Sequence, residues 1–161
     1  MGLFSFIKEA GAKVFGTSKP AVDDAADAAA AKKRVEEAAA SQLEETIQDL
    51  SLQVDGLKID ISGDTATITG AAYDQKTKEK VVLVVGNTSG IAVVDDQMTV
   101  TNPEPEAQFY TVEKGDTLSK IAKEYYGNAM KYPVIFEANK PMLKDANLIY
   151  PGQVLRIPAL D

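Results

Sequence analysis

The sequence predicts an α+β protein, with an N-terminal helix and an α/β unit followed by a small β-α-α-β unit. Three observations support this fold class. Apolar residues follow a helical spacing near residue 40, polar and apolar residues alternate near residue 60, and a strand–helix–helix–strand pattern begins near residue 109. The chain has 161 residues, 45% of them hydrophobic and 25% charged, which is typical of one ordinary or two small folded domains.

The first 34 residues are expected to form an amphipathic helix and an alanine-rich connector. Lys8, Glu9 and Lys13 lie on one side of this helix, and the apolar positions on the other side are Leu3, Phe4, Ile7, Gly11, Val14 and Phe15. The helix lacks the Lys/Arg-rich face of a membrane-surface helix, so we expect it to pack on its own protein. The pattern leaves open whether residues 17–34 form a long helix or are partly disordered.

Residues 35–101 are expected to form the α/β unit. Its first helix carries an apolar stripe made of Val35, Ala39, Leu43, Ile47 and Leu50. The stretch "GLKIDISGDTATITG" alternates apolar and polar residues around "SGD", which predicts a hairpin with one buried face. The stretch "DQKTKEKVVLVVGNTSG" predicts a helix that ends at Gly86 or Asn87, and "IAVVDDQMTV" predicts one final strand.

Residues 102–108 contain two prolines and no apolar anchor, and predict a short, stiff linker before the second unit. In residues 109–161, "FYTV" and "VLRIP" predict the two strands of this unit. Between them, "KGDTLSKIAKEYYG" predicts a helix capped by Asp116 or Thr117, and "AMKYPVIFEANK" predicts a helix with Pro133 in its first turn. The inner face of the first helix is expected to carry Leu118, Ile121, Ala122 and Tyr125.

Composition argues against several classes of function. The net charge of −7 disfavours nucleic acid, because affinity there comes largely from basic side chains on phosphates. The chain has no cysteine and no histidine, and no carboxylate pair has a telling spacing, so we do not expect an enzyme. No stretch has the order of a secretory signal or approaches the roughly 20 apolar residues of a membrane-spanning helix. We therefore expect a cytosolic protein that inserts into no membrane.

The C-terminal segment closely resembles a LysM domain through "YTVEKGDTLSKIAKEYYGN", "IFEANK" and "IYPGQVLRIP". LysM modules commonly bind N-acetylglucosamine-containing glycans between two loops, which here would be residues 115–118 and 140–150. The central segment resembles a BON domain through "TITG" and "VGNTSGIAVVDD". BON domains are usually found in envelope or osmotic-stress proteins and are often supposed to touch phospholipid.

The order of "MGLFSFIKEAG", a BON-like unit and a LysM-like unit is similar to that of the cytoplasmic bacterial potassium-binding proteins. The alanine-rich stretch "TSKPAVDDAADAAAAKKR" departs from that family as a longer insertion. The resemblance implies a monomeric K⁺ sensor that prefers K⁺ to Na⁺, with Rb⁺ and Cs⁺ as further candidate ions, and uses the LysM fold as an internal docking partner. The alternative is an envelope or stress protein that binds peptidoglycan or lipid.

Main-chain carbonyls suit K⁺, because they can replace the hydration shell of a large, weakly hydrated ion. The helix that reaches Val85 leaves its last carbonyls without helical partners, and Gly86, Asn87 and Gly90 can turn further carbonyls the same way. Taken without the resemblance, such a loop is usually just a connection. The resemblance places the K⁺ ligands on main-chain carbonyls there and in "IKEAGA", namely those of Ile7, Ala10, Ala12, Gly86, Thr88 and Ile91.

Overall fold

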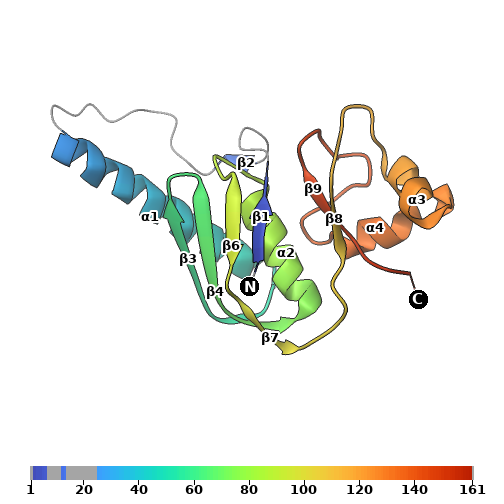
Figure 1. Cartoon of the computed structure of the whole chain (residues 1–161), viewed down its shortest axis with the longest axis horizontal. Coiled ribbons are helices and arrows are strands. Elements are labelled where there is room, and N and C mark those ends of the chain that lie inside the picture. Colours follow the sequence, from blue (N-terminus) through green and yellow to red (C-terminus); the bar gives the residue numbers. More distant parts are fainter. Residues whose placement is uncertain (1, 7–11, 14–24, 161) are drawn as a thin grey trace.

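The computed structural model describes residues 2–6, 12–13 and 25–160, and it confirms the mixed α+β architecture (Figure 1). The described residues form two hydrophobic cores. We call the part of the chain around the first core, up to residue 102, the N-terminal unit. The part from residue 108 onward, around the second core, is the C-terminal unit.

The N-terminal unit contains a five-stranded sheet. Residues of this sheet and of two helices together form the first hydrophobic core. The strand order is β1-β6-β4-β3, and β7 pairs with β4 beyond the end of β6. The strands are β1 (Gly2–Ser5), β3 (Val54–Ser62), β4 (Thr65–Asp74), β6 (Val93–Asp96) and β7 (Thr99–Asn102). The helices are α1 (Ala25–Asp49) and α2 (Gln75–Gly86). Strands β3 and β4 form the predicted antiparallel hairpin.

Helix α1 is longer than the predicted helix of this unit, because residues 25–34 of the alanine-rich stretch continue it without a break. Ala39, Leu43 and Ile47 of the predicted stripe are buried, while Val35 and Leu50 are half-buried. The carboxylate of Glu44 accepts a hydrogen bond of 2.8 Å from the N–H of Ile59, which ties α1 to the edge strand β3. Among the described helices, none is long and apolar enough to cross a membrane.

The predicted N-terminal helix is wrong for residues 2–5, which form strand β1. This strand pairs antiparallel with β6, with Phe4 opposite Val94. Leu3 and Ser5 are exposed, whereas Phe4 and Phe6 are half-buried, so the exposure alternates as it does along a strand. A helix this short is marginal on its own, and the open side of β6 offers backbone hydrogen bonds instead. The rest of the predicted helix lies outside the described residues, apart from Ala12 and Lys13 in strand β2 (Ala12–Lys13).

The single final strand predicted for this unit is also wrong, because the chain forms two strands, β6 and β7, with a break at residues 97–98. Both strands pair parallel with β4. The N–H of Gln97 donates to the carbonyl of Ile68 at 2.9 Å, and the N–H of Met98 donates to the carboxylate of Asp96 at 3.0 Å. These bonds satisfy the backbone where the strand is interrupted.

The C-terminal unit has the predicted β-α-α-β order. It consists of β8 (Gln108–Thr111), α3 (Leu118–Tyr126), a 3₁₀ turn at Ala129–Lys131, α4 (Tyr132–Ala138) and β9 (Val154–Ile157). Thr117 caps α3 by accepting from the N–H of Lys120, and Gly127 ends it in the left-handed conformation. Pro133 lies in the first turn of α4, as predicted.

At α3, Thr117 is the predicted cap that is used, whereas Tyr125 differs from the prediction. Asp116 does not cap the helix, and its carboxylate instead accepts hydrogen bonds from the hydroxyl of Tyr110 at 2.6 Å and from the N–H of Glu113 at 2.8 Å. Tyr125 is 36% exposed and stands edge-on to Tyr110, while Tyr126 packs against the core in its place. Periodicity alone does not separate two adjacent tyrosines at the end of a helix.

The contact between Phe6 and Gly86 yields a first prediction. A Cβ atom at Gly86 would overlap with the ring of Phe6. We expect Gly86→Ala to lower the free energy of unfolding by about 1–3 kcal/mol, because the ring must leave its place. In a Phe6→Ala background the same substitution should be neutral or stabilising, because alanine is the better helix former. Urea unfolding of the four proteins measures this, and an equal loss in both backgrounds would contradict the contact.

The bonds to Asp116 yield a second prediction. The hydrogen bond from the Tyr110 hydroxyl, together with that from the Glu113 N–H, holds the pKa of Asp116 below its usual value of 3.8. A depressed carboxyl pKa stabilises the fold above the unfolded pKa, and this contribution is lost as the pH falls through the folded pKa. We expect Asp116→Asn to lower the melting temperature at pH 7 and the difference from wild type to shrink below about pH 4. Thermal melting from pH 3 to pH 7 tests this, and a constant difference would count against it.

Candidate cation site

The end of helix α2 brings together most of the described residues predicted as ligands. Gly86 is the last residue of α2, Asn87 is its C-cap, and Thr88 begins strand β5 (Thr88–Ser89). Strand β5 pairs parallel with β2, so that Ala12 lies beside Thr88. The structure therefore juxtaposes two stretches that are more than 70 positions apart in the sequence. Ile7 and Ala10, the other two predicted ligands, lie outside the described residues.

The carbonyls at this helix end differ in their hydrogen bonds. Those of Leu83 and Val85 accept from the N–H of Asn87, and that of Val84 accepts from the Thr88 hydroxyl at 3.0 Å. The carbonyl of Thr88 accepts a bond of 3.2 Å from the N–H of Ile91, which uses one of its two lone pairs. Within the described part of the chain, the carbonyls of Gly86 and Ile91 have no backbone or side-chain donor.

The residues that carry these carbonyls are buried and have no charged side chains. Gly86 is buried, Thr88 is 1% exposed and Ile91 is fully buried. The last turn of α2 carries no basic residue, so no nearby side chain of that turn neutralises the negative end of the helix dipole. In residues 2–6, 12–13 and 25–160, no group of three or more Asp, Glu, His or Cys residues is placed to hold a metal ion. Chemically, this arrangement offers neutral oxygen ligands at a negative helix end.

Gly86 and Asn87 do not adopt the left-handed backbone conformation that was considered for this loop. Gly86 has no positive φ, and Asn87 has φ −80° and ψ 12°, so neither adopts the left-handed conformation. Gly90 does, with φ 99°. Gly86 is needed for its small size, because the ring of Phe6 occupies the space that a side chain would fill. The prediction missed Phe6 at this position, since it assigned that segment to a helix.

The same loop reaches the C-terminal unit through the side chain of Asn87. The amide nitrogen of Asn87 donates to the carbonyl of Val154 at 2.9 Å, and its amide oxygen accepts from the N–H of Val154 at 2.7 Å. Val154 belongs to β9, which pairs with β8 on its other edge. No feature of the sequence pattern indicates this contact, because its partner on β9 is main chain.

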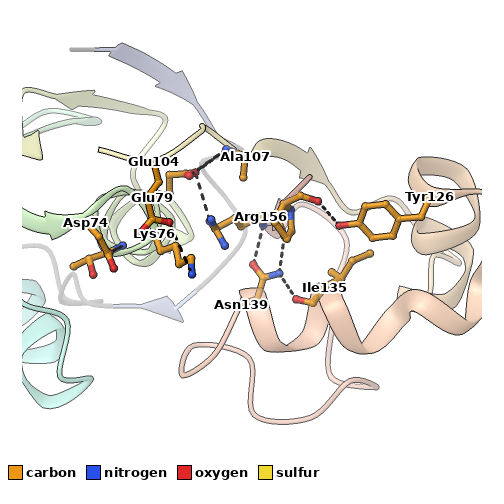
Figure 2. A network of polar contacts seen from close by, with 11 residues as sticks. Asp74, Lys76, Glu79, Glu104, Ala107, Tyr126, Ile135, Asn139 and Arg156 are labelled. Atoms are coloured by element: carbon orange, nitrogen blue, oxygen red, sulfur yellow. Dashed lines mark hydrogen bonds and ion pairs between the residues drawn. The ribbon is translucent and has the colours of Figure 1, made fainter. Parts of the chain in front are cut away.

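A second contact between the units involves two buried charges. The carboxylate of Glu79, on α2, lies 3.4 Å from the Nε of Arg156 and accepts from the N–H of Ala107 at 3.1 Å (Figure 2). Both side chains of the ion pair are 6% exposed. Burial raises the pKa of Glu79, and the nearby Arg156 guanidinium opposes that rise. An aromatic contact adds to this interface, with the rings of Phe4 and Phe109 5.2 Å apart.

The C-terminal unit also has a groove where the LysM resemblance expects glycan to bind. It has a volume of about 340 Å³ and lies between the start of α3 and the loop before β9. Thr117, Tyr132 and Asn147 are among the side chains that line it. This groove is formed by different residues from those that contact the N-terminal unit.

Comparisons with known proteins identify a domain family and several relatives of this chain. Residues 110–158 match the LysM domain family. The chain is 50% identical to the potassium binding protein Kbp of Escherichia coli O6:H1, over 98% of this chain and 99% of the relative. Two further relatives match only about a third of the chain. They are an uncharacterised protein of Deinococcus radiodurans, 53% identical over 30% of this chain and 19% of its own, and a Mycobacterium tuberculosis esterase, 45% identical over 33% and 11%.

The likeness to the first of these relatives extends from end to end in both proteins, and so includes the N-terminal unit, the LysM domain and the linker between them. The chain belongs to the family of the potassium binding protein Kbp.

Proposed function

We propose that this protein is a cytosolic K⁺ sensor, whose ion is held by main-chain carbonyls at the end of α2. The observation that carries the proposal is the parallel pairing of Ala12 with Thr88, directly after the helix end at Gly86. It supports a site built jointly by the N-terminal segment and the loop at residues 86–91. Membership in the Kbp family supports K⁺ as the ion.

The proposed ligands are the six carbonyls predicted from the sequence, on residues Ile7, Ala10, Ala12, Gly86, Thr88 and Ile91. Among the described residues, and apart from the strand ladders, the Gly86 and Ile91 carbonyls receive no hydrogen bond and the Thr88 carbonyl receives one, from the N–H of Ile91. Neutral carbonyls suit K⁺ better than carboxylates do. They can replace the loosely held water around the ion, and they repel one another less than negatively charged carboxylates would. Rb⁺ and Cs⁺, which are of similar character, are expected to compete.

Ion binding at this place would be coupled to the arrangement of the chain around it. Directly after the loop, the carbonyl of Ala92 accepts a bond of 2.8 Å from the Phe6 N–H, which ties this region to the N-terminal segment. The loop is held to the C-terminal unit by the side chain of Asn87. A ligand shifts a conformational equilibrium by its differential affinity for the two states. An ion that fixes this loop therefore favours the state in which both neighbours are docked.

Thermal melting in KCl, NaCl and choline chloride at equal ionic strength tests the proposal. A bound ion stabilises the folded state by about 2.7 kcal/mol at a hundredfold excess over its Kd. For a protein of this size, we expect the melting temperature to be roughly 5–10 °C higher in KCl than in choline chloride. NaCl should give a much smaller rise. Equal melting temperatures in the three salts would rule out selective K⁺ binding.

A second candidate function is glycan binding by the C-terminal unit, which the groove beside Thr117 and Asn147 supports. If glycan binds in this groove, the protein should co-sediment with purified peptidoglycan. Sugar rings would pack on the ring of Tyr132, and sugar hydroxyls would form hydrogen bonds with the polar groups around it. We expect at most weak sedimentation that does not change on Tyr132→Ala. Strong sedimentation that Tyr132→Ala abolishes would make glycan binding the leading function.

A further inference from the structure

Two asparagine side chains form hydrogen bonds with backbone groups of strand β9, on the edge that does not pair with β8. Asn139 donates to the carbonyl of Arg156 at 2.9 Å and accepts from its N–H at 2.8 Å, as Figure 2 shows. Asn87 forms the equivalent pair of bonds with Val154, two residues earlier. Each asparagine is the C-cap of a helix, α4 and α2 respectively. One edge of β9 is thus completed partly by its own unit and partly by the other unit.

The difference between the two asparagines lies in what controls their position. Asn139 follows α4 and is 2% exposed inside the C-terminal unit, so it does not depend on the N-terminal unit. Asn87 stands between Gly86 and Thr88, whose carbonyls are proposed K⁺ ligands. Any ion held by both carbonyls fixes the backbone on either side of Asn87, and with it the direction of the side-chain amide.

We propose that Asn87 transmits ion occupancy to the C-terminal unit, by presenting its amide to Val154 when the flanking carbonyls are ligated. This inference rests on the proposed function. Bonds of 2.7 and 2.9 Å are sensitive to position, and they weaken steeply when the two groups move apart or tilt. A small change in the loop is therefore enough to open the contact. By linkage, docking of the C-terminal unit raises the affinity for K⁺ by the same factor by which K⁺ favours docking.

The Glu79–Arg156 ion pair has a different part in the interface. Glu79 lies on α2 seven residues before Gly86, and it contacts Arg156 and the N–H of Ala107 rather than the loop. It therefore contributes to the interface without touching the loop that carries the proposed K⁺ ligands. The same is true of the contact between Phe4 and Phe109. These contacts supply docking strength, and Asn87 makes that docking depend on the ion.

The wild-type protein allows a direct measurement with an internal control. Amide hydrogen exchange of Val154 and Arg156, followed by NMR, compares an amide bonded to Asn87 with one bonded to Asn139. We expect replacement of KCl by choline chloride to speed exchange at Val154 at least about tenfold and to leave Arg156 nearly unchanged, because ordinary coupling factors are about 5 to 150. Unchanged exchange at Val154, in a protein whose melting responds to K⁺, would overturn the inference.

A matched pair of variants tests the cause. The chain has no cysteine, so Ser41→Cys on α1 and Lys123→Cys on α3, both at exposed positions, allow fluorescent labelling of the two units. Calorimetry with KCl measures ion binding, and energy transfer between the labels measures the arrangement. In Asn87→Ala we expect K⁺ affinity to fall about tenfold and the KCl-dependent change in energy transfer to disappear. Asn102→Ala is the control, since Asn102 donates to the Tyr73 carbonyl within the N-terminal unit, and it should behave as wild type.

The outcomes separate the two proposals. If the wild type neither binds K⁺ nor changes its energy transfer, the proposed function fails and this inference fails with it. If the wild type responds and Asn87→Ala responds equally, K⁺ sensing stands and the role of Asn87 is refuted. Should Asn87→Ala not fold, or not bind K⁺ at all, the exchange of Val154 in the wild type decides, with ion-dependent exchange supporting the inference and ion-independent exchange refuting it.

Discussion

Helix α2 ends inside the protein, and the backbone groups at that end have to find partners there. A helix leaves its last carbonyls without partners inside the helix, and a buried carbonyl without a partner is costly. Here the backbone and side chains that follow satisfy those of Leu83, Val84 and Val85. The next carbonyls belong to a loop that contacts both the N-terminal segment and the C-terminal unit. The helix end therefore lies where three parts of the chain meet.

The N-terminal segment completes this region in two ways. Strand β1 extends the sheet beside β6 and brings Phe6 over Gly86, where no larger residue than glycine fits beside the ring. Strand β2 then pairs with β5 directly after the helix end. Because these strands are short, they derive their stability from the partner strands rather than from their own sequence.

The C-terminal unit has one surface for docking and a separate one that could hold glycan. The open edge of β9 and the side chain of Arg156 face the N-terminal unit, whereas the groove beside Thr117 opens between α3 and the loop before β9. The LysM fold thus presents an edge for docking without covering this groove. A fold does not by itself decide between such uses, because function is determined by the residues at the site.

The α+β class, the hairpin around Gly63, the position of α2 and the β-α-α-β order of the C-terminal unit could all be predicted from the sequence. These features follow from local periodicity and caps, such as Thr117 and Gly127 on α3. Three features depend on contacts between distant parts of the chain: residues 2–5 form a strand, the strand after the loop breaks at Gln97, and Asn87 reaches Val154. The reason is physical: a segment as short as "GLFSF" fits either period, and the β6 edge that selects the strand is about ninety residues away. The role of Asn87 could not be foreseen either, because its partner is a backbone N–H and carbonyl, which every residue but proline carries.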